Sequence, residues 1–171
     1  MSGVVTVVVG NPKPASRTGS AARRVGERLA AHVGAGVRCV DLAELGPALL
    51  VPGDARVRQV VEDMASSTAT VVASPTYKAT YSGILKLLFD QVGAGAMGGA
   101  PGVPMMVAAA PQHALAVDVH LRPLMVEVGF SCPGPGLFLL ESELATIDER
   151  LDGWLPGWAR WLPEATGEER P

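Results

Sequence analysis

The feature that most constrains the fold is a run of six β-branched residues, 4 to 9, which ends at Gly10. Strands with one solvated face alternate apolar and polar residues, so a run without alternation predicts a strand covered on both faces. A loop containing two prolines follows. Ala22, Val25, Leu29 and Val33 then recur at helical spacing. This strand–loop–helix unit is typical of proteins built on a parallel sheet.

The same alternation continues along the chain. Four further apolar runs predict strands over residues 37–42, 69–73, 104–110 and 137–140. The third strand is expected to stop at Ser74-Pro75, and the first helix at Gly34 and Gly36. Each predicted strand is followed by a segment with helical periodicity.

The later helices differ in character. Asp54 is positioned to cap a helix that presents Val57, Val60, Val61 and Met64 on one face. Residues 83–92 are apolar nearly all round, which predicts a helix buried twice, against its own core and against another subunit. Pro123 should kink the fourth helix. Leu151, Trp154, Trp158 and Trp161 predict a last helix, bent at Pro156-Gly157.

Five strands alternating with helices indicate an α/β fold whose sheet is covered on both faces. Right-handed crossovers leave few topologies, and five strands fit the flavodoxin-like three-layer sandwich with strand order 2-1-3-4-5. The length of 171 residues suits one domain. We therefore expect a single domain over residues 1–171, with a frayed polar tail from about residue 164.

Composition excludes several function classes. The formal net charge is −3 and aromatic residues make up 5% of the chain, which argues against a nucleic-acid partner. No apolar run approaches the roughly 20 residues that span a membrane, and no basic segment precedes the first strand. We therefore expect a cytoplasmic protein without membrane association.

Few side chains suggest direct chemistry. Cys39 and Cys132 form no CxxC pattern, which predicts two free thiols. His113 and His120 lie seven residues apart without a convincing third ligand, so no metal site is predicted. The absence of a GxSxG motif and of a paired-carboxylate signature leaves hydrolysis without support.

The loop after the first strand carries the most information. It ends in Ser16, Arg17 and Thr18, at the start of a helix whose free N–H groups and partial positive charge suit a phosphate. Asn11 and the hydroxyls can hydrogen-bond, while Lys13 and Arg17 supply charge. The alternative is an ordinary serine-capped helix after a proline-containing loop. Neither GxGxxG nor a P-loop is present.

The loop after the third strand, residues 74–83, combines a proline with aromatic and basic residues. Tyr77 could pack beside a flat ring, and Lys78 would favour negative charge on it. The alternative is a simple strand-to-helix turn with a surface lysine. Ligands of parallel sheets bind beyond the carboxyl ends of the strands, so both loops are expected at one site.

These two loops, with Leu121-Arg122-Pro123 further along, resemble the NADPH-dependent FMN reductase family. The nearest branch is that of the reductases serving alkanesulfonate-type two-component monooxygenases, and the resemblance covers roughly residues 4 to 162. It implies that the FMN phosphate is held by Asn11, Lys13, Ser16 and Thr18, with Arg17 beside them. It implies that the isoalloxazine edge is held by Pro75, Thr76, Tyr77 and Lys78.

Three departures from the family pattern stand out. The family more often has serine at Asn11 and arginine at Lys13, and lysine cannot give the two-pronged grip of arginine. The loop after the fourth strand usually carries Gly-Gly but here reads Ala108 to His113, with Gln112 as a further expected cofactor contact. Val119 stands where relatives often have tyrosine, at an irregular helical turn that some members place at a subunit interface.

The resemblance implies an NAD(P)H-dependent FMN reductase that passes reduced FMN to a partner monooxygenase. Hydride transfer to flavin requires no protein acid or base, so no catalytic side chain is expected. NADH and NADPH remain alternatives, as do a homodimer and a homotetramer. The rival functions are an FMN-retaining reductase of quinones or azo dyes and an interaction subunit that has lost flavin binding.

Overall fold

The computed structural model describes residues 3–163, in which five parallel strands form one sheet. The strand order is β2-β1-β3-β4-β5, so the predicted flavodoxin-like topology is confirmed. The strands are β1 (Val4–Val9), β2 (Gly36–Asp41), β3 (Ala69–Pro75), β4 (Gly102–Ala108) and β5 (Leu137–Leu140).

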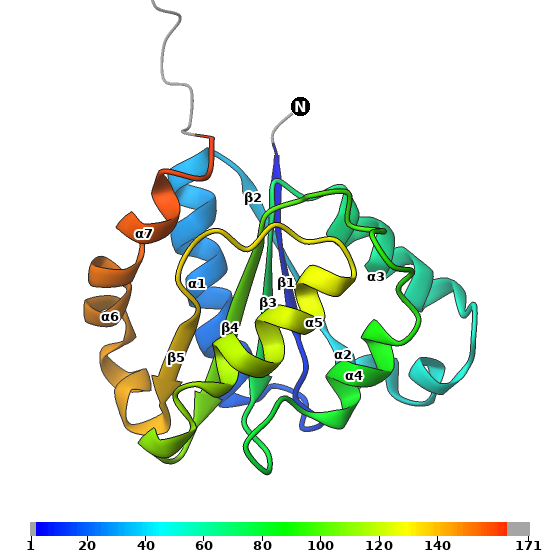
Figure 1. Cartoon of the computed structure of the whole chain (residues 1–171), viewed down its shortest axis with the longest axis horizontal. Helices are drawn as coiled ribbons and strands as arrows, with labels where there is room; N and C mark the ends of the chain where they lie inside the picture. The colour runs from blue at the N-terminus through cyan, green and yellow to red at the C-terminus, as the bar shows by residue number, and fades with distance from the viewer. Residues whose placement is uncertain (1–2, 164–171) are drawn as a thin grey trace, which may run out of the picture.

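Helices cover both faces of this sheet (Figure 1). On one face lie α1 (Arg17–Val33), α6 (Ile147–Trp154) and α7 (Pro156–Ala159). On the other lie α3 (Ala55–Ala65), α4 (Gly83–Phe89) and α5 (Arg122–Glu127). The short α2 (Leu42–Leu45) and the 3₁₀ turns η1 (Gly46–Leu50), η2 (Pro111–His113) and η4 (Glu141–Thr146) connect them.

The first strand shows why its sequence does not alternate. Val5, Val7 and Val9 pack into the core beneath α1, while Val8 packs into the core beneath α3 and α4. Thr6 shares a buried hydrogen bond of 2.6 Å with Ser67, which satisfies its hydroxyl. Both faces of β1 are therefore buried, as the unbroken β-branched run predicted.

Several predicted boundaries were wrong. Gly36 begins β2 instead of ending the preceding helix, and Leu42 begins α2 instead of ending the strand. β3 continues through Pro75, because its pairing with β1 ends at Ala73 and the missing N–H of Pro75 faces that vacated side. β4 spans Gly102–Ala108, two residues earlier than predicted, and α4 ends at Phe89.

The proline-containing helix is irregular, as expected. A π-helical turn, η3 (Val117–Leu121), precedes α5, and Pro123 lies in the first turn of α5. A proline in the first turn removes an N–H that would have no intrahelical partner there. The disruption is therefore taken up by the wider turn just before the proline.

The carboxyl-terminal helix bends at Pro156, as predicted, and divides into α6 and α7. Leu151 and Trp158 are fully buried against the sheet, whereas Trp161 lies beyond α7 and is 49% exposed. The predicted frayed tail from residue 164 lies outside the described residues. Among residues 3–163, no helix combines the length and apolar character needed to cross a membrane.

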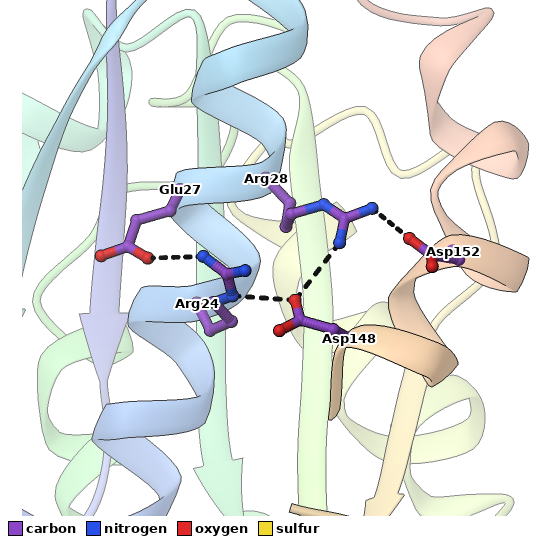
Figure 2. A network of polar contacts seen from close by, with 5 residues as sticks. All are labelled: Arg24, Glu27, Arg28, Asp148 and Asp152. Atoms are coloured by element: carbon purple, nitrogen blue, oxygen red, sulfur yellow. Dashed lines mark hydrogen bonds and ion pairs between the residues drawn. The ribbon is translucent and has the colours of Figure 1, made fainter. Parts of the chain in front are cut away.

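An ion-pair cluster joins α6 to α1 (Figure 2). Arg24 Nε donates to Asp148 Oδ1 over 2.8 Å, and Arg28 reaches both Asp148, at 3.2 Å, and Asp152. Arg24 also contacts Glu27 of its own helix. The hydrogen bond from Arg24 lowers the pKa of the Asp148 carboxyl, with a smaller contribution from Arg28.

This pKa shift gives a pH-dependent stabilisation. The Asp148 pKa is lower in the folded chain, so its pairing stabilises above the unfolded pKa of about 3.9 and is lost as pH falls through the folded value. We expect Asp148→Asn to destabilise the protein at pH 7 and to destabilise it less near pH 3. Urea unfolding of both proteins at low salt measures this, and an equal difference at both pH values would contradict it.

Candidate functional site

A cavity of about 350 Å³ opens at the carboxyl ends of the central strands. It lies where a parallel sheet of this order is expected to bind ligands, and its volume is in the range of small-molecule sites. Three loops and the residue after β5 form its wall. The lining residues are Asn11, Lys13, Ala15, Ser16, Arg17, Thr18, Pro75, Thr76, Tyr77, Val107, Ala108, Ala109 and Glu141.

The first loop presents hydroxyls at the start of α1. Ser16 caps the helix, accepting a hydrogen bond of 3.1 Å from the Gly19 N–H. Asn11 Nδ2 donates to Thr18 Oγ1 over 3.2 Å, and Asn11 Oδ1 accepts from the Lys13 N–H. Asn11, Ser16 and Thr18 are all buried, so these bonds fix the loop around the first helical turn.

Strained backbone is concentrated in the site loops. Ala15, Lys78 and Ala79 are the non-glycine residues with positive φ among residues 3–163. Such conformations cost on the order of 1–2 kcal/mol each and persist where surrounding contacts hold them. The Ala15 N–H donates to Asp41 Oδ2 over 3.2 Å, and Asp41 also caps α2. The end of β2 therefore supports the first loop.

The second loop folds into a tight turn. The Tyr77 N–H donates to the Thr80 carbonyl over 2.9 Å, and the Thr80 N–H donates to the Tyr77 carbonyl over 3.2 Å. With positive φ at Lys78 and Ala79, this is the geometry of a type I′ turn. The turn places Tyr77, 48% exposed, at the cavity wall and carries Lys78 away from it.

Two buried serines connect the second loop to the first. Ser74 Oγ accepts from the Ser82 N–H over 2.9 Å, and the Ser82 hydroxyl donates to the Gly10 carbonyl. A Cβ at Gly10 would lie 2.7 Å from the Leu85 Cβ, so glycine allows α4 to approach this closely. The two walls of the cavity therefore form one hydrogen-bonded unit.

Thr76 has the most informative side chain of the cavity. Its Oγ1 is buried and has no hydrogen-bond partner among the described residues, although its N–H donates to the Val107 carbonyl over 2.7 Å. Buried hydroxyls are almost always paired, because an unmade bond costs about 1–3 kcal/mol. Thr76 is one of the residues that line the cavity, so its hydroxyl is a candidate hydrogen-bond partner for a ligand there.

The charges of the cavity are not all of one sign. Lys13 and Arg17 supply two cations, but Arg17 Nη2 donates to Glu141 Oε2 over 2.7 Å. Glu141 was not among the residues expected at the site. The signal that could have indicated it is its position, since it is the first residue after the last strand and so lies at the carboxyl edge.

Two expected contacts do not line the cavity. Gln112 is exposed in η2, and Lys78 is exposed in the turn, so both remain predictions as flavin contacts. The third loop instead contributes Ala108 and Ala109, with Val107 before them. The side chains that replace the family's Gly-Gly thus form part of the wall, as the sequence suggested for this loop.

Other features offer no comparable chemistry. A larger hollow of about 510 Å³ beside α3, lined by Pro52, Val57 and Val61, includes no residue of the three loops. Cys39 and Cys132 are free, and burial raises the pKa of the Cys132 thiol to about 11, which keeps it protonated and unreactive at neutral pH. No metal-binding group of His, Cys, Asp or Glu occurs within residues 3–163.

Comparison with known proteins identifies the family. Residues 4–144 match the family model described as NADPH-dependent FMN reductase. This chain belongs to that family. The match confirms the family expected from the sequence, and with it an oxidoreductase class that uses FMN and a nicotinamide dinucleotide.

Two FMN reductases of known name are similar to this family member in sequence. The NADH-dependent FMN reductase SfnF of Pseudomonas putida is 32% identical over 126 residues, which cover 70% of this chain and 68% of the relative. An FMN reductase (NADPH) of Pseudomonas aeruginosa is 36% identical over 70 residues, which cover 41% of this chain and 38% of that protein. The two names differ in the nicotinamide used, so they leave that choice open.

Solved structures agree with the fold. The apo form of the NADH:FMN oxidoreductase EMOB superposes with a TM-score of 0.86 at 24% identity, covering 96% of this chain and 92% of that one. A flavodoxin from Pseudomonas aeruginosa gives a TM-score of 0.62 at 20% identity, covering 93% and 98%. At these identities the likeness establishes the flavodoxin-like fold alone.

The residues present fit FMN. A phosphate monoester needs donors and positive charge, which buried hydroxyls, the first turn of α1 and two cations provide. A planar ring needs a flat wall and a few polar contacts, which Tyr77, Pro75 and the unpaired Thr76 hydroxyl provide.

Proposed function

We propose that this chain is an NAD(P)H-dependent FMN reductase that binds FMN in the cavity at the ends of β1, β3 and β4. The observation that carries the proposal is that one cavity joins a hydroxyl-rich helix start to Thr76, whose buried hydroxyl has no hydrogen-bond partner among the described residues. The first suits a phosphate, and the second suits a polar ring edge. FMN has both groups, at opposite ends of one molecule.

The phosphate-binding part of the proposal assigns Asn11, Lys13, Ser16, Arg17 and Thr18 to the phosphate. Ser16 and Thr18 lie at the positive end of α1, where negative charge is stabilised. Asn11 holds Thr18 through its side-chain amide, so its role is to orient that hydroxyl. Lys13 is exposed and contributes a point charge rather than a two-pronged contact.

Ring binding is assigned to Pro75, Thr76 and Tyr77. Pro75 ends β3 and directs the chain into the cavity wall, and Tyr77 is placed to pack against a flat ring. When bound, FMN supplies the hydride acceptor, so binding and orientation are the work left to the chain. No side chain has to donate or accept a proton for that step, and we assign none.

We infer that the reduced flavin leaves the site rather than staying in it. Lys13 is exposed, and Arg17, the stronger phosphate ligand, is already paired with Glu141. Weak phosphate binding suits a diffusible product that is passed to a flavin-dependent monooxygenase. The alternative, an FMN-retaining reductase of quinones or azo dyes, requires stronger binding of the FMN phosphate than these residues indicate.

The oligomeric state also belongs to the proposal. Leu115, just before η3, Val119 in η3 and Val126 in α5 are 72%, 55% and 53% exposed. Exposed apolar residues at helical spacing favour contact with another copy of the chain, as a homodimer or homotetramer. A cytoplasmic location is likewise proposed from the sequence.

Steady-state assays test the proposed activity. With FMN present, the purified protein should oxidise NADH or NADPH with a turnover number on the order of 10 per second, the median for enzymes. The measurement is the loss of reduced-nicotinamide absorbance, with an FMN and nicotinamide mixture lacking protein as control. Rates equal to that control with both nicotinamides would contradict the proposal. Retention of yellow colour through dialysis would instead favour the FMN-retaining alternative.

A further inference from the structure

Three ion pairs between α1 and the segment after β5 share one sequence offset. Arg17 pairs with Glu141, Arg24 with Asp148 and Arg28 with Asp152, and each pair is separated by 124 residues. We call these three pairs the ion-pair row. Its second and third pairs are visible in Figure 2.

The constant offset has a geometric cause. Steps of 7 and 11 residues return to nearly the same face of an α-helix, so the three arginines share one face of α1. Glu141, Asp148 and Asp152 follow the same steps. Because η4 and α6 run alongside α1 in the same direction, each acidic residue meets the arginine at its own level.

The first pair differs from the other two in its surroundings. Arg17 and Glu141 both line the cavity at the ends of the strands, whereas Arg24, Arg28, Asp148 and Asp152 do not. Glu141 is the single carboxylate among the cavity-lining residues. It therefore occupies a place where a phosphate would be expected to meet arginine.

The position of Glu141 is held by its neighbour. Glu143 accepts a hydrogen bond of 2.7 Å from the Leu140 N–H, which closes the turn that carries Glu141. Glu143 also contacts Arg150 of α6 at 3.4 Å. The carboxylate of Glu141 is thus presented toward Arg17 by a capped turn, although both side chains keep substantial exposure of 44% and 70%.

We propose that Glu141 competes with the phosphate of FMN for Arg17 and thereby sets how readily the flavin leaves. This inference rests on the proposed FMN site. An FMN phosphate carries a charge of about −1.5 to −2 at neutral pH, so it must displace the carboxylate or share the arginine with it. The carboxylate occupies the guanidinium that the phosphate would otherwise contact. Glu141 is a positioning residue, since it acts through Arg17.

The test compares FMN with riboflavin, which has the same ring but no phosphate. We expect Glu141→Gln to lower the Kd for FMN by about fivefold and to leave the Kd for riboflavin unchanged, since a surface charge contact is worth up to about a factor of five. Fluorescence titration measures both constants. The FMN effect should shrink at high salt, because the interaction is between charges in partly exposed positions.

Asp152→Asn is the matched control, because it removes a pair of the same row away from the cavity. It should leave the ratio of the FMN and riboflavin constants at the wild-type value. In an Arg17→Ala background, Glu141→Gln should increase the affinity for FMN by a smaller factor than it does in the wild-type chain. An equal gain there would show that Arg17 is not the group competed for.

The outcomes separate this inference from the proposed function. If neither wild type nor variant binds FMN or riboflavin, the FMN site itself is refuted. If the wild type binds FMN but Glu141→Gln leaves its affinity unchanged or weaker, competition is refuted while the FMN site stands. Equal changes for FMN and riboflavin would assign Glu141 a structural role and would also overturn the competition.

Discussion

Replacing Thr76 with valine is expected to weaken FMN binding about tenfold, the effect of losing one good hydrogen bond in a buried site. The same change should leave the ligand-free protein as stable as before, or slightly more stable. Thr76 Oγ1 has no partner among the described residues, so a methyl group in its place removes an unmade bond. Fluorescence titration and urea unfolding measure the two effects.

Thr68→Val provides the control. Thr68 directly precedes β3, at the amino ends of the strands, where its N–H donates to the Val4 carbonyl. It does not line the cavity. Its replacement should leave FMN affinity unchanged. Because Thr76 is assigned to the ring rather than the phosphate, Thr76→Val should weaken riboflavin binding as much as FMN binding. Unchanged affinity for both flavins would contradict the assignment.

Replacing Trp158 with alanine is expected to lower the free energy of unfolding by about 3–5 kcal/mol, the usual cost of emptying a buried aromatic site. Trp158 is fully buried, packs beside Trp154 at a ring distance of 6.3 Å, and donates from Nε1 to the Pro135 carbonyl over 2.8 Å. A Cβ at Gly134 would lie 2.4 Å from the Trp158 ring, so backbone packs directly against the ring there and glycine has no side chain to fill the space. Denaturant unfolding measures the loss.

Trp161 tests whether burial causes this effect. It has the same side chain three residues later, but it is 49% exposed, and the Arg160 guanidinium lies 5.2 Å from its ring centroid. Exposed cation–π contacts contribute about 0.5–1 kcal/mol, so Trp161→Ala should cost no more than that. Equal losses at both positions would contradict the assignment of Trp158 to the core beneath α6 and α7.

Local patterns were sufficient for the fold. The unbroken β-branched run of β1, Gly34 in the left-handed conformation after α1 and the Asp54 cap all appear where the sequence indicated them. The errors lie at boundaries, where a partner strand decides the outcome. Pro75 stays in β3 because β1 has already ended beside it, which no property of residues 69–75 alone could indicate.

The candidate site was predicted in part for the same reason. Most of the expected cofactor residues line one cavity, because the carboxyl ends of parallel strands meet at one edge of the sheet. Lys78 and Gln112 do not, because a type I′ turn and an exposed 3₁₀ turn direct them elsewhere. The type I′ turn depends on positive φ values at Lys78 and Ala79, which lysine and alanine rarely adopt, so the sequence carries no signal for it.

The sequence by itself determined the order of strands and helices, the handedness of their connections and the edge of the sheet at which the candidate site lies. These follow from local periodicity and chirality, which act over short stretches of chain. Only the tertiary structure brought Glu141 to Arg17 and left Thr76 Oγ1 without a partner among residues 3–163. Both depend on the exact alignment of segments distant in sequence, 124 residues apart for the ion pair, and local propensity carries no information about that alignment.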